Sequence, residues 1–187
     1  MRAPVVLASG HAVQAIRRES LASSDGNETG GILLGHDNGA TLMITAAGDP
    51  GPDAKRSQTA FTRDVAHAQA LADTAYEYDC SLWIGEWHTH PRGPTAPSMT
   101  DLATYMSLLS DPRLGFARVL SVLVTPDAQR RWVDPRMRAF VVQQPAGTPG
   151  AVEVTVCEMR LGSSHALGAI RDQVDDGSAD EEGQHAR

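Results

Sequence analysis

Residues 87–101 read Trp87-His88-Thr89-His90-Pro91-Arg92-Gly93-Pro94-Thr95-Ala96-Pro97-Ser98-Met99-Thr100-Asp101, and this stretch indicates both the fold and the chemistry of the chain. His88 and His90 follow an apolar run, residues 81–85, that is typical of a buried strand. Side chains two residues apart project from the same face of a strand, so both imidazoles should point to one side. The loop that follows is rich in proline and glycine, and we expect it to fold back and bring Asp101 near the histidines at the start of the next helix.

This set of side chains predicts a metal site. Two imidazoles and one carboxylate, with one position left for water, form the ligand set of a catalytic zinc ion rather than a structural one. We therefore predict one Zn²⁺ per chain, held by His88, His90 and Asp101. Two plainer interpretations stay open: Ser98-x-x-Asp101 before a helical segment also matches a helix capping box, and the histidines could be ordinary buried or exposed side chains.

The same residues resemble the motif of the JAMM metalloproteases, also called MPN-plus or JAB proteins, which is an upstream Glu followed by H-x-H-x(7)-S-x(2)-D. His88, His90, Ser98 and Asp101 match its downstream part without a gap, and Glu28 matches the upstream glutamate. The resemblance covers roughly residues 4–145. It implies that Glu28 acts as general base and then general acid, and that Ser98 donates a hydrogen bond to the developing oxyanion. The zinc ion would supply hydroxide at neutral pH.

Glu28 has competing interpretations. Asn27-x-Thr29 matches a glycosylation acceptor, although no signal peptide is recognisable before it, and a carboxylate in a loop is ordinarily solvated. Glu86 lies two residues before His88 and could share its face of the strand. We assign the base to Glu28, because Gly30 and Gly31 allow a close backbone approach and because the resemblance places it there. Glu86 is expected to support a metal ligand by hydrogen bonding.

Composition sets the broad class. With 187 residues the chain is expected to form one domain with a substantial core. A net charge of −7 argues against a dedicated nucleic-acid binder, and no apolar run approaches the length of a transmembrane helix. Cys80 and Cys157 do not have zinc-finger spacing, so we interpret both as buried free thiols of a protein in the reducing cytoplasm.

Hydrophobic periodicity predicts an α/β fold with a curved mixed β-sheet flanked by helices. The resemblance implies that this fold is a single JAB/MPN-like domain. We expect this domain over residues 1–160, a C-terminal helix over 161–174 and a disordered acidic tail over 175–187. A loop is predicted over residues 49–59. The expected helices cover residues 11–22, 64–78 and a segment that ends near 110, and the expected strands cover 4–9, 30–36, 41–47, 60–63, the run before His88, 118–124, 137–143 and 152–157.

The resemblance also implies a substrate. Members of the family cleave isopeptide or peptide bonds after the C-terminal tail of ubiquitin or a ubiquitin-like protein. Residues 85–91 look most like bacterial members that accompany E1- and E2-like proteins in antiphage operons, such as the deconjugases of CBASS and of ubiquitin-like conjugation systems. We therefore expect deconjugation or precursor processing, with a ubiquitin-like protein or its conjugate as partner and neither nucleic acid nor membrane.

Three alternatives remain at this point. A sulfur-carrier-processing enzyme or small-molecule amide hydrolase would use the same residues. A RadC-like DNA-associated protein usually has Asn between the histidines, where Thr89 stands here, and a basic region upstream. A non-catalytic MPN scaffold would normally lack the ligands.

Overall fold

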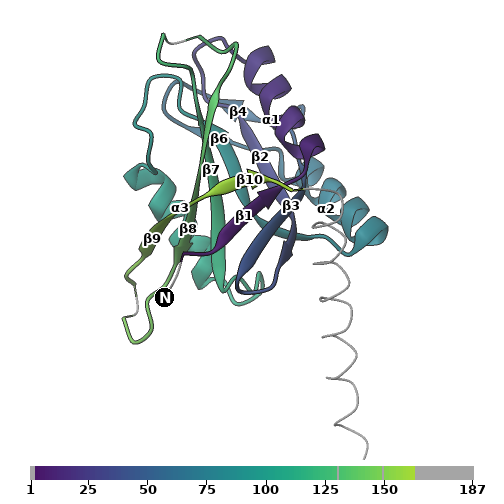
Figure 1. The fold of residues 1–187 in the computed structure, drawn as a ribbon, viewed down its shortest axis with the longest axis vertical. Helices are drawn as coiled ribbons and strands as arrows, with labels where there is room; N and C mark the ends of the chain where they lie inside the picture. Colours follow the sequence, from purple (N-terminus) through teal and green to yellow (C-terminus); the bar gives the residue numbers. More distant parts are fainter. Residues whose placement is uncertain (1–2, 130, 149, 163–187) are drawn as a thin grey trace, which may run out of the picture.

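The computed structural model describes residues 3–129, 131–148 and 150–162, which form one α/β domain (Figure 1). Eight strands build a single sheet in the order β10-β1-β3-β2-β6-β7-β8-β9, and β4 and β5 form a separate two-stranded hairpin. The elements in chain order are β1 (Val5–Ala8), α1 (Gly10–Ala22), β2 (Gly30–Asp37), β3 (Thr41–Ala47), β4 (Lys55–Arg56), β5 (Phe61–Thr62), α2 (Val65–Asp79), β6 (Leu82–Thr89), α3 (Met99–Ser110), β7 (Arg118–Thr125), β8 (Arg136–Gln143), β9 (Glu153–Cys157) and β10 (Met159–Leu161).

The sheet is mixed and strongly curved. β1 pairs in parallel with both β3 and β10, and β6 pairs in parallel with β7, whereas the other neighbours are antiparallel. β9 and β10 occupy opposite edges of the sheet although only Glu158 separates them along the chain. Because one residue cannot span a flat eight-stranded sheet, the two edges must curl toward each other.

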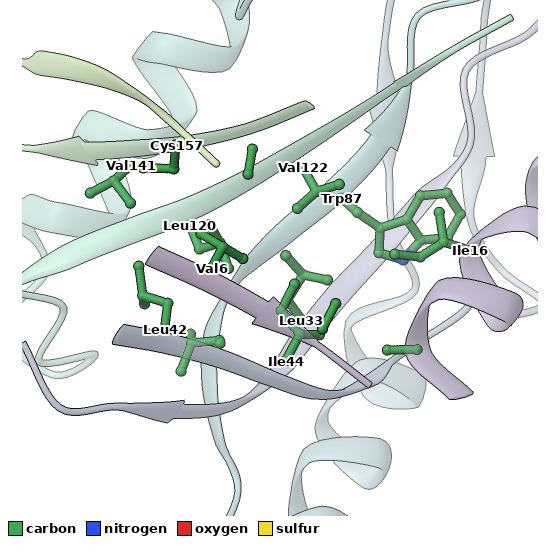
Figure 2. Packing of buried hydrophobic residues seen from close by; sticks show 14 of the residues in the cluster. Val6, Ile16, Leu33, Leu42, Ile44, Trp87, Leu120, Val122, Val141 and Cys157 are labelled. Atoms are coloured by element: carbon green, nitrogen blue, oxygen red, sulfur yellow. The ribbon is translucent and has the colours of Figure 1, made fainter. Parts of the chain in front are cut away.

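The two faces of the sheet bury different apolar clusters. On one face, Ile16 of α1 packs into a core that contains Leu33 and Trp87 (Figure 2). On the other face, α2 packs through Ala68 on Ile32 and its neighbours, while α3 contributes Tyr105 to a third cluster. The adjacent β2 residues Ile32 and Leu33 therefore point to opposite faces of the sheet, as the two-residue period of a strand requires.

The predicted fold class is confirmed, and every expected strand and helix within the described ranges is present to within a few residues. Two elements were not expected: β4 lies inside the predicted loop 49–59, and β10 adds an edge strand that ends at Leu161. The rest of the predicted C-terminal helix and the whole acidic tail lie outside the described residues. Within the described ranges, no helix is both long enough and apolar enough to cross a membrane.

The prediction for one cysteine was wrong. Cys157 is buried, as expected, but Cys80 is exposed. Cys80 ends α2 as its C-cap in the left-handed region, with φ of 57°, and its backbone N–H donates to the Tyr76 carbonyl. A capping residue lies at the end of its helix, where the chain turns toward the next strand, so its side chain is directed to solvent rather than into the sheet.

Candidate metal centre

The end of β6 places both histidines on one side of the sheet. Their Nε2 atoms are 3.0 Å apart and both side chains are buried, whereas Trp87, the residue before His88, packs into the core on the opposite face. The His90 N–H donates to the Val124 carbonyl of β7 at 2.8 Å, so the backbone stays fixed one residue beyond the strand. The His90 Nδ1–H donates to the Pro94 carbonyl at 2.8 Å, which leaves Nε2 as the ring nitrogen that can bind a metal.

The first turn of α3 brings Asp101 to these two rings. Its carboxylate oxygens lie 3.3 Å from His88 Nε2 and 3.3 Å from His90 Nε2. The capping box is also present: the Asp101 N–H donates to Ser98 Oγ, and the Ser98 N–H donates to Asp101 Oδ2 at 2.6 Å. The Asp101 carboxylate therefore belongs to both the helix cap and the candidate ligand set, because the cap holds the carboxylate that faces the histidines.

The spacing of these donor atoms fits a single tetrahedral ion. Ligands bound at about 2.0–2.1 Å in a tetrahedron lie roughly 3.3 Å from one another. The two Nε2 atoms are 3.0 Å apart, and each lies 3.3 Å from a different oxygen of the Asp101 carboxylate, so the separations are close to that edge. His88, His90 and Asp101 can thus hold a metal ion, and they leave a fourth position open.

The charged groups of the site shift one another's pKa values. Burial raises the pKa of Asp101, but hydrogen bonds from His88, His90 and the Ser98 amide outweigh burial and keep that pKa well below its usual range. For His90, burial lowers the pKa, while Asp101 and the Pro94 carbonyl raise it, with a net increase. The carboxylate is therefore ionised at neutral pH, as a metal ligand must be.

Glu28 faces the same site from the segment before β2. It lines a cavity of about 200 Å³ together with Glu86, His88 and Asp101, and its side chain is buried. Burial raises the pKa of Glu28, and His88 and His90 oppose that increase. The Glu28 N–H donates to the Ser57 carbonyl at 2.7 Å, and its carbonyl accepts from Arg56 Nε at 3.0 Å, so the β4–β5 hairpin fixes this residue.

The glycine after Glu28 and Thr29 permits the approach of β2 to β6. Gly30 pairs with His88, and a Cβ at Gly30 would lie 2.3 Å from the Trp87 carbonyl oxygen and 2.8 Å from His88 Cβ. Real Cβ atoms do not make such contacts, so only glycine brings the Glu28 segment this close to the histidines.

The hydrogen-bonding partner of Glu86 is Arg63, which the sequence did not single out. The Arg63 guanidinium donates to the Glu86 carboxylate and also lies 5.0 Å from the ring centroid of Trp83. Burial raises the pKa of Glu86, and Arg63 opposes this. Arg63 follows the short strand β5 and is 23 residues from Glu86 along the chain, so no local spacing could have indicated this pair.

The chain matches the family of prokaryotic homologs of the JAB domain over residues 10–139. It belongs to this family. The match includes Glu28 and every residue of the candidate metal centre, so the site lies within the JAB domain. The expected membership of the JAB/MPN group is confirmed.

Several curated relatives share the same name. Proteins named CD-NTase/cGAS isopeptidase from Escherichia coli and Vibrio cholerae are 33% identical over 81 residues and 34% identical over 76 residues, which is 42% and 40% of this chain. The chain spans about half the length of these relatives, 52% and 49%. A Pseudomonas aeruginosa protein of that name is 33% identical over 118 residues, 62% of this chain and 74% of that protein.

The fold also resembles a solved structure. The solution structure of a Desulfitobacterium hafniense protein superposes with a TM-score of 0.59 over 86% of this chain and 97% of that protein, at 16% sequence identity. At that identity the similarity concerns the fold alone.

Proposed function

We propose that this JAB-domain protein is a zinc-dependent isopeptidase that cleaves after the C-terminus of a ubiquitin-like protein. The observation that carries the proposal is the convergence of His88, His90 and Asp101, whose ligand atoms lie within 4.8 Å of one another, beside the buried Glu28. A zinc ion in such a site polarises a carbonyl and lowers the pKa of a water to about 7.

Glu28 is the residue we assign to proton transfer. Its carboxyl is buried beside the histidines, and its raised pKa brings it closer to neutral pH, where a general base is most effective. It accepts a proton from the attacking water and then delivers that proton to the leaving amine. Glu86 is less suited to this role because its carboxylate already accepts from Arg63.

Ser98 is the residue we assign to the oxyanion. Its hydroxyl accepts a hydrogen bond from the Asp101 N–H at 3.2 Å. A serine hydroxyl has one donor in addition to its acceptor lone pairs, so this cap leaves the O–H free to donate to a substrate oxygen. The same serine can therefore end the loop, fix Asp101 and stabilise developing negative charge.

The name that the relatives share supports a class of substrate. They are named CD-NTase/cGAS isopeptidases, and we infer that this chain releases a comparable protein conjugate in a bacterial antiphage system. E1- and E2-like proteins would form the conjugate, and a ubiquitin-like tail would enter the site as an extended strand. A precursor with residues beyond the modifier's C-terminus would be processed by the same chemistry.

Two measurements on the purified protein test this function. Elemental analysis should find about one zinc per chain, since His88, His90 and Asp101 form one tetrahedral site. Cleavage of a ubiquitin-like fusion and of a lysine-linked conjugate should then require zinc and Glu28, with Glu28→Gln inactive and the exposed Glu77→Gln as a matched control that retains activity. Zinc-loaded protein that cleaves neither substrate but releases cysteine from a sulfur-carrier adduct would replace the isopeptidase proposal with the sulfur-carrier function.

A further inference from the structure

A groove lined by arginines lies beside the candidate metal centre, and we call it the arginine groove. Its volume is about 780 Å³, and four arginines from three elements contribute to its lining: Arg17 of α1, Arg136 and Arg138 of β8, and Arg160 of β10. Thr95, Thr125 and Arg136 line both this groove and a neighbouring cavity of about 240 Å³ that reaches His90. The arginine groove is therefore continuous with the surroundings of a candidate metal ligand.

The arginine groove is positively charged although the chain as a whole is acidic. Asp134 is the one acidic residue among the described residues that line it, whereas the whole chain has a net charge of −7. Arg138 donates to the hydroxyl and the backbone carbonyl of Thr95, and the Arg136 guanidinium has no hydrogen-bond or ion-pair partner in the ranges that the structure describes. Both charges are therefore available to a negatively charged ligand.

The other two arginines of the groove have partners that an incoming ligand can replace. Arg17 pairs with Asp134 at 3.0 Å and Arg160 with Glu158 at 2.6 Å, and all four side chains are more than half exposed. Exposed ion pairs of this kind contribute little to stability, because water screens them and ordering the side chains costs entropy. Another carboxylate can therefore take the place of either partner.

The walls of the arginine groove include the edges of two strands. β9 pairs with β8 only over residues 139–143, so within the described ranges residues 136–138 of β8 pair on one side alone, with β7. β10 ends the eight-stranded sheet, and its described neighbour is β1. Residues 136–138 and 159–161 all line the groove. Unpaired strand edges present backbone N–H and C=O groups, which an extended chain can bind.

The side chains of β8 define which extended chain fits. Arg136 and Arg138 are two residues apart, so they project from the same face of the strand at a spacing of about 7 Å. Met137 lies between them and packs against the core, and it also lines the groove. A strand laid beside this segment alternates in the same way. Two carboxylates at positions i and i+2 would therefore face the arginines, and an apolar residue between them would face Met137.

These features favour an acidic peptide over a nucleic acid. The apolar part of the lining includes Val13, Met137 and Met159, which a sugar–phosphate backbone cannot use. A strand edge also recognises the backbone of a polypeptide and not that of a nucleic acid. The net charge of −7 repels a long polyanion, whereas a short acidic segment responds mainly to the arginines within a Debye length of it.

We propose that the arginine groove binds an extended acidic segment of a partner protein, with two carboxylates facing Arg136 and Arg138 and an apolar residue facing Met137. Because the groove is continuous with the cavity at His90, a segment bound there lies beside the metal centre. The partner is therefore the conjugate that the enzyme cleaves, and this last step alone rests on the proposed function.

Binding of short peptides to the full chain tests the groove without any catalysis. The probe is a fluorescein-labelled peptide with the core Asp-Val-Asp-Val-Asp, and its matched control has Asn at the three acidic positions. Fluorescence anisotropy should show at least tenfold tighter binding of the acidic peptide, and this binding should weaken as salt is raised. Arg136→Glu should weaken it about tenfold or more, because it replaces attraction by repulsion. Arg113→Glu, at an exposed arginine outside the groove, should leave it unchanged.

A second variant and a second readout keep the test decisive. Arg136→Gln removes the charge without adding repulsion, and thermal unfolding checks that each variant is folded. The acidic peptide should shift the backbone amide signals of residues 136–138, and shifts confined to other residues would overturn the proposal. Equal binding of the two peptides, or equal effects of Arg113→Glu and Arg136→Glu, would do so as well. A single-stranded oligonucleotide that binds the groove more tightly than the acidic peptide would assign the groove to nucleic acid instead.

Kinetics separate this inference from the proposed function. With a conjugate that carries the acidic segment next to its isopeptide bond, Arg136→Glu should raise the KM about tenfold while its kcat falls less. Peptide binding in the groove without cleavage of any conjugate would refute the proposed function and leave the groove assignment intact. Equal cleavage of that conjugate by the wild type and by Arg136→Glu would overturn the assignment of the groove to the substrate.

Discussion

Replacing Ser98 with Ala separates its role as helix cap from its proposed role as oxyanion donor. Loss of the cap should lower stability slightly, whereas loss of the donor should lower turnover greatly. The substitution removes the hydrogen bond from the Asp101 N–H to Ser98 Oγ, and it leaves the 2.6 Å bond from the Ser98 N–H to Asp101 in place. Loss of one capping hydrogen bond costs about 1 kcal/mol. For a chain of this size, that lowers Tm by about 2–4 °C.

The effect on catalysis should be much larger. Loss of an oxyanion donor lowers kcat by about 100- to 1000-fold. Zinc should stay bound, since His88, His90 and the retained backbone bond to Asp101 are unaffected. Thermal unfolding, zinc per chain and turnover per zinc-loaded chain are measured on the same preparations, with Ser98→Thr as the control that keeps the hydroxyl.

One outcome would refute this assignment. If Ser98→Ala loses a few degrees of stability but keeps full turnover per bound zinc, then Ser98 is only the N-cap of α3. A fall in zinc content parallel to the fall in activity would instead mean that the hydroxyl acts through Asp101.

Four further predictions concern the surrounding residues. Glu28→Gln should bind zinc normally and lose hydrolysis, and robust cleavage by this variant would transfer the base to Glu86. His88→Ala or Asp101→Asn should lower zinc content itself and, with it, the Tm of the zinc-loaded protein, which elemental analysis and thermal unfolding measure together. Gly30→Ala should destabilise the fold and reduce zinc binding, because its Cβ would overlap the Trp87 carbonyl; a variant of normal Tm would contradict this reason. Arg63→Ala should leave Glu86 without its counterion and raise the pKa of Glu86 further. The folded protein would then hold the proton of the Glu86 carboxyl more tightly than the unfolded chain does. The stability of that variant relative to wild type should then fall as pH rises from the ordinary pKa of a glutamate toward the raised one, and a pH-independent difference in urea unfolding would contradict it.

The residues of the candidate metal centre could be predicted from sequence because their geometry is largely local. His88 and His90 obey the two-residue period of a strand, and Ser98 and Asp101 obey the three-residue offset of a capping box. Each pair is fixed by its own element, so only the loop between them had to be inferred. The pairing of β2 with β3 could be predicted equally well, because a short turn connects these two neighbouring strands.

Residues that act across long separations were not predictable in the same way. Arg63 meets Glu86, and Arg138 meets Thr95, only after β5, β6, β8 and the loop between β6 and α3 have been assembled. Cys80 was predicted as buried from its apolar neighbours, but its position as a left-handed helix cap exposes it. β10 is a three-residue strand, and its pairing with β1 requires the curl of the whole sheet.

The sequence by itself determined the α/β class and indicated the candidate metal ligands and the glutamate proposed as base, because these depend on residue type and on short-range periodicity. Only the tertiary structure decided that the ligand atoms of His88, His90 and Asp101 lie within 4.8 Å of one another, that Glu28 is buried beside them, and that four arginines from α1, β8 and β10 line one groove. The physical reason is that distance, burial and charge at this site arise between elements far apart in the chain, and the curvature of the sheet brings those elements together.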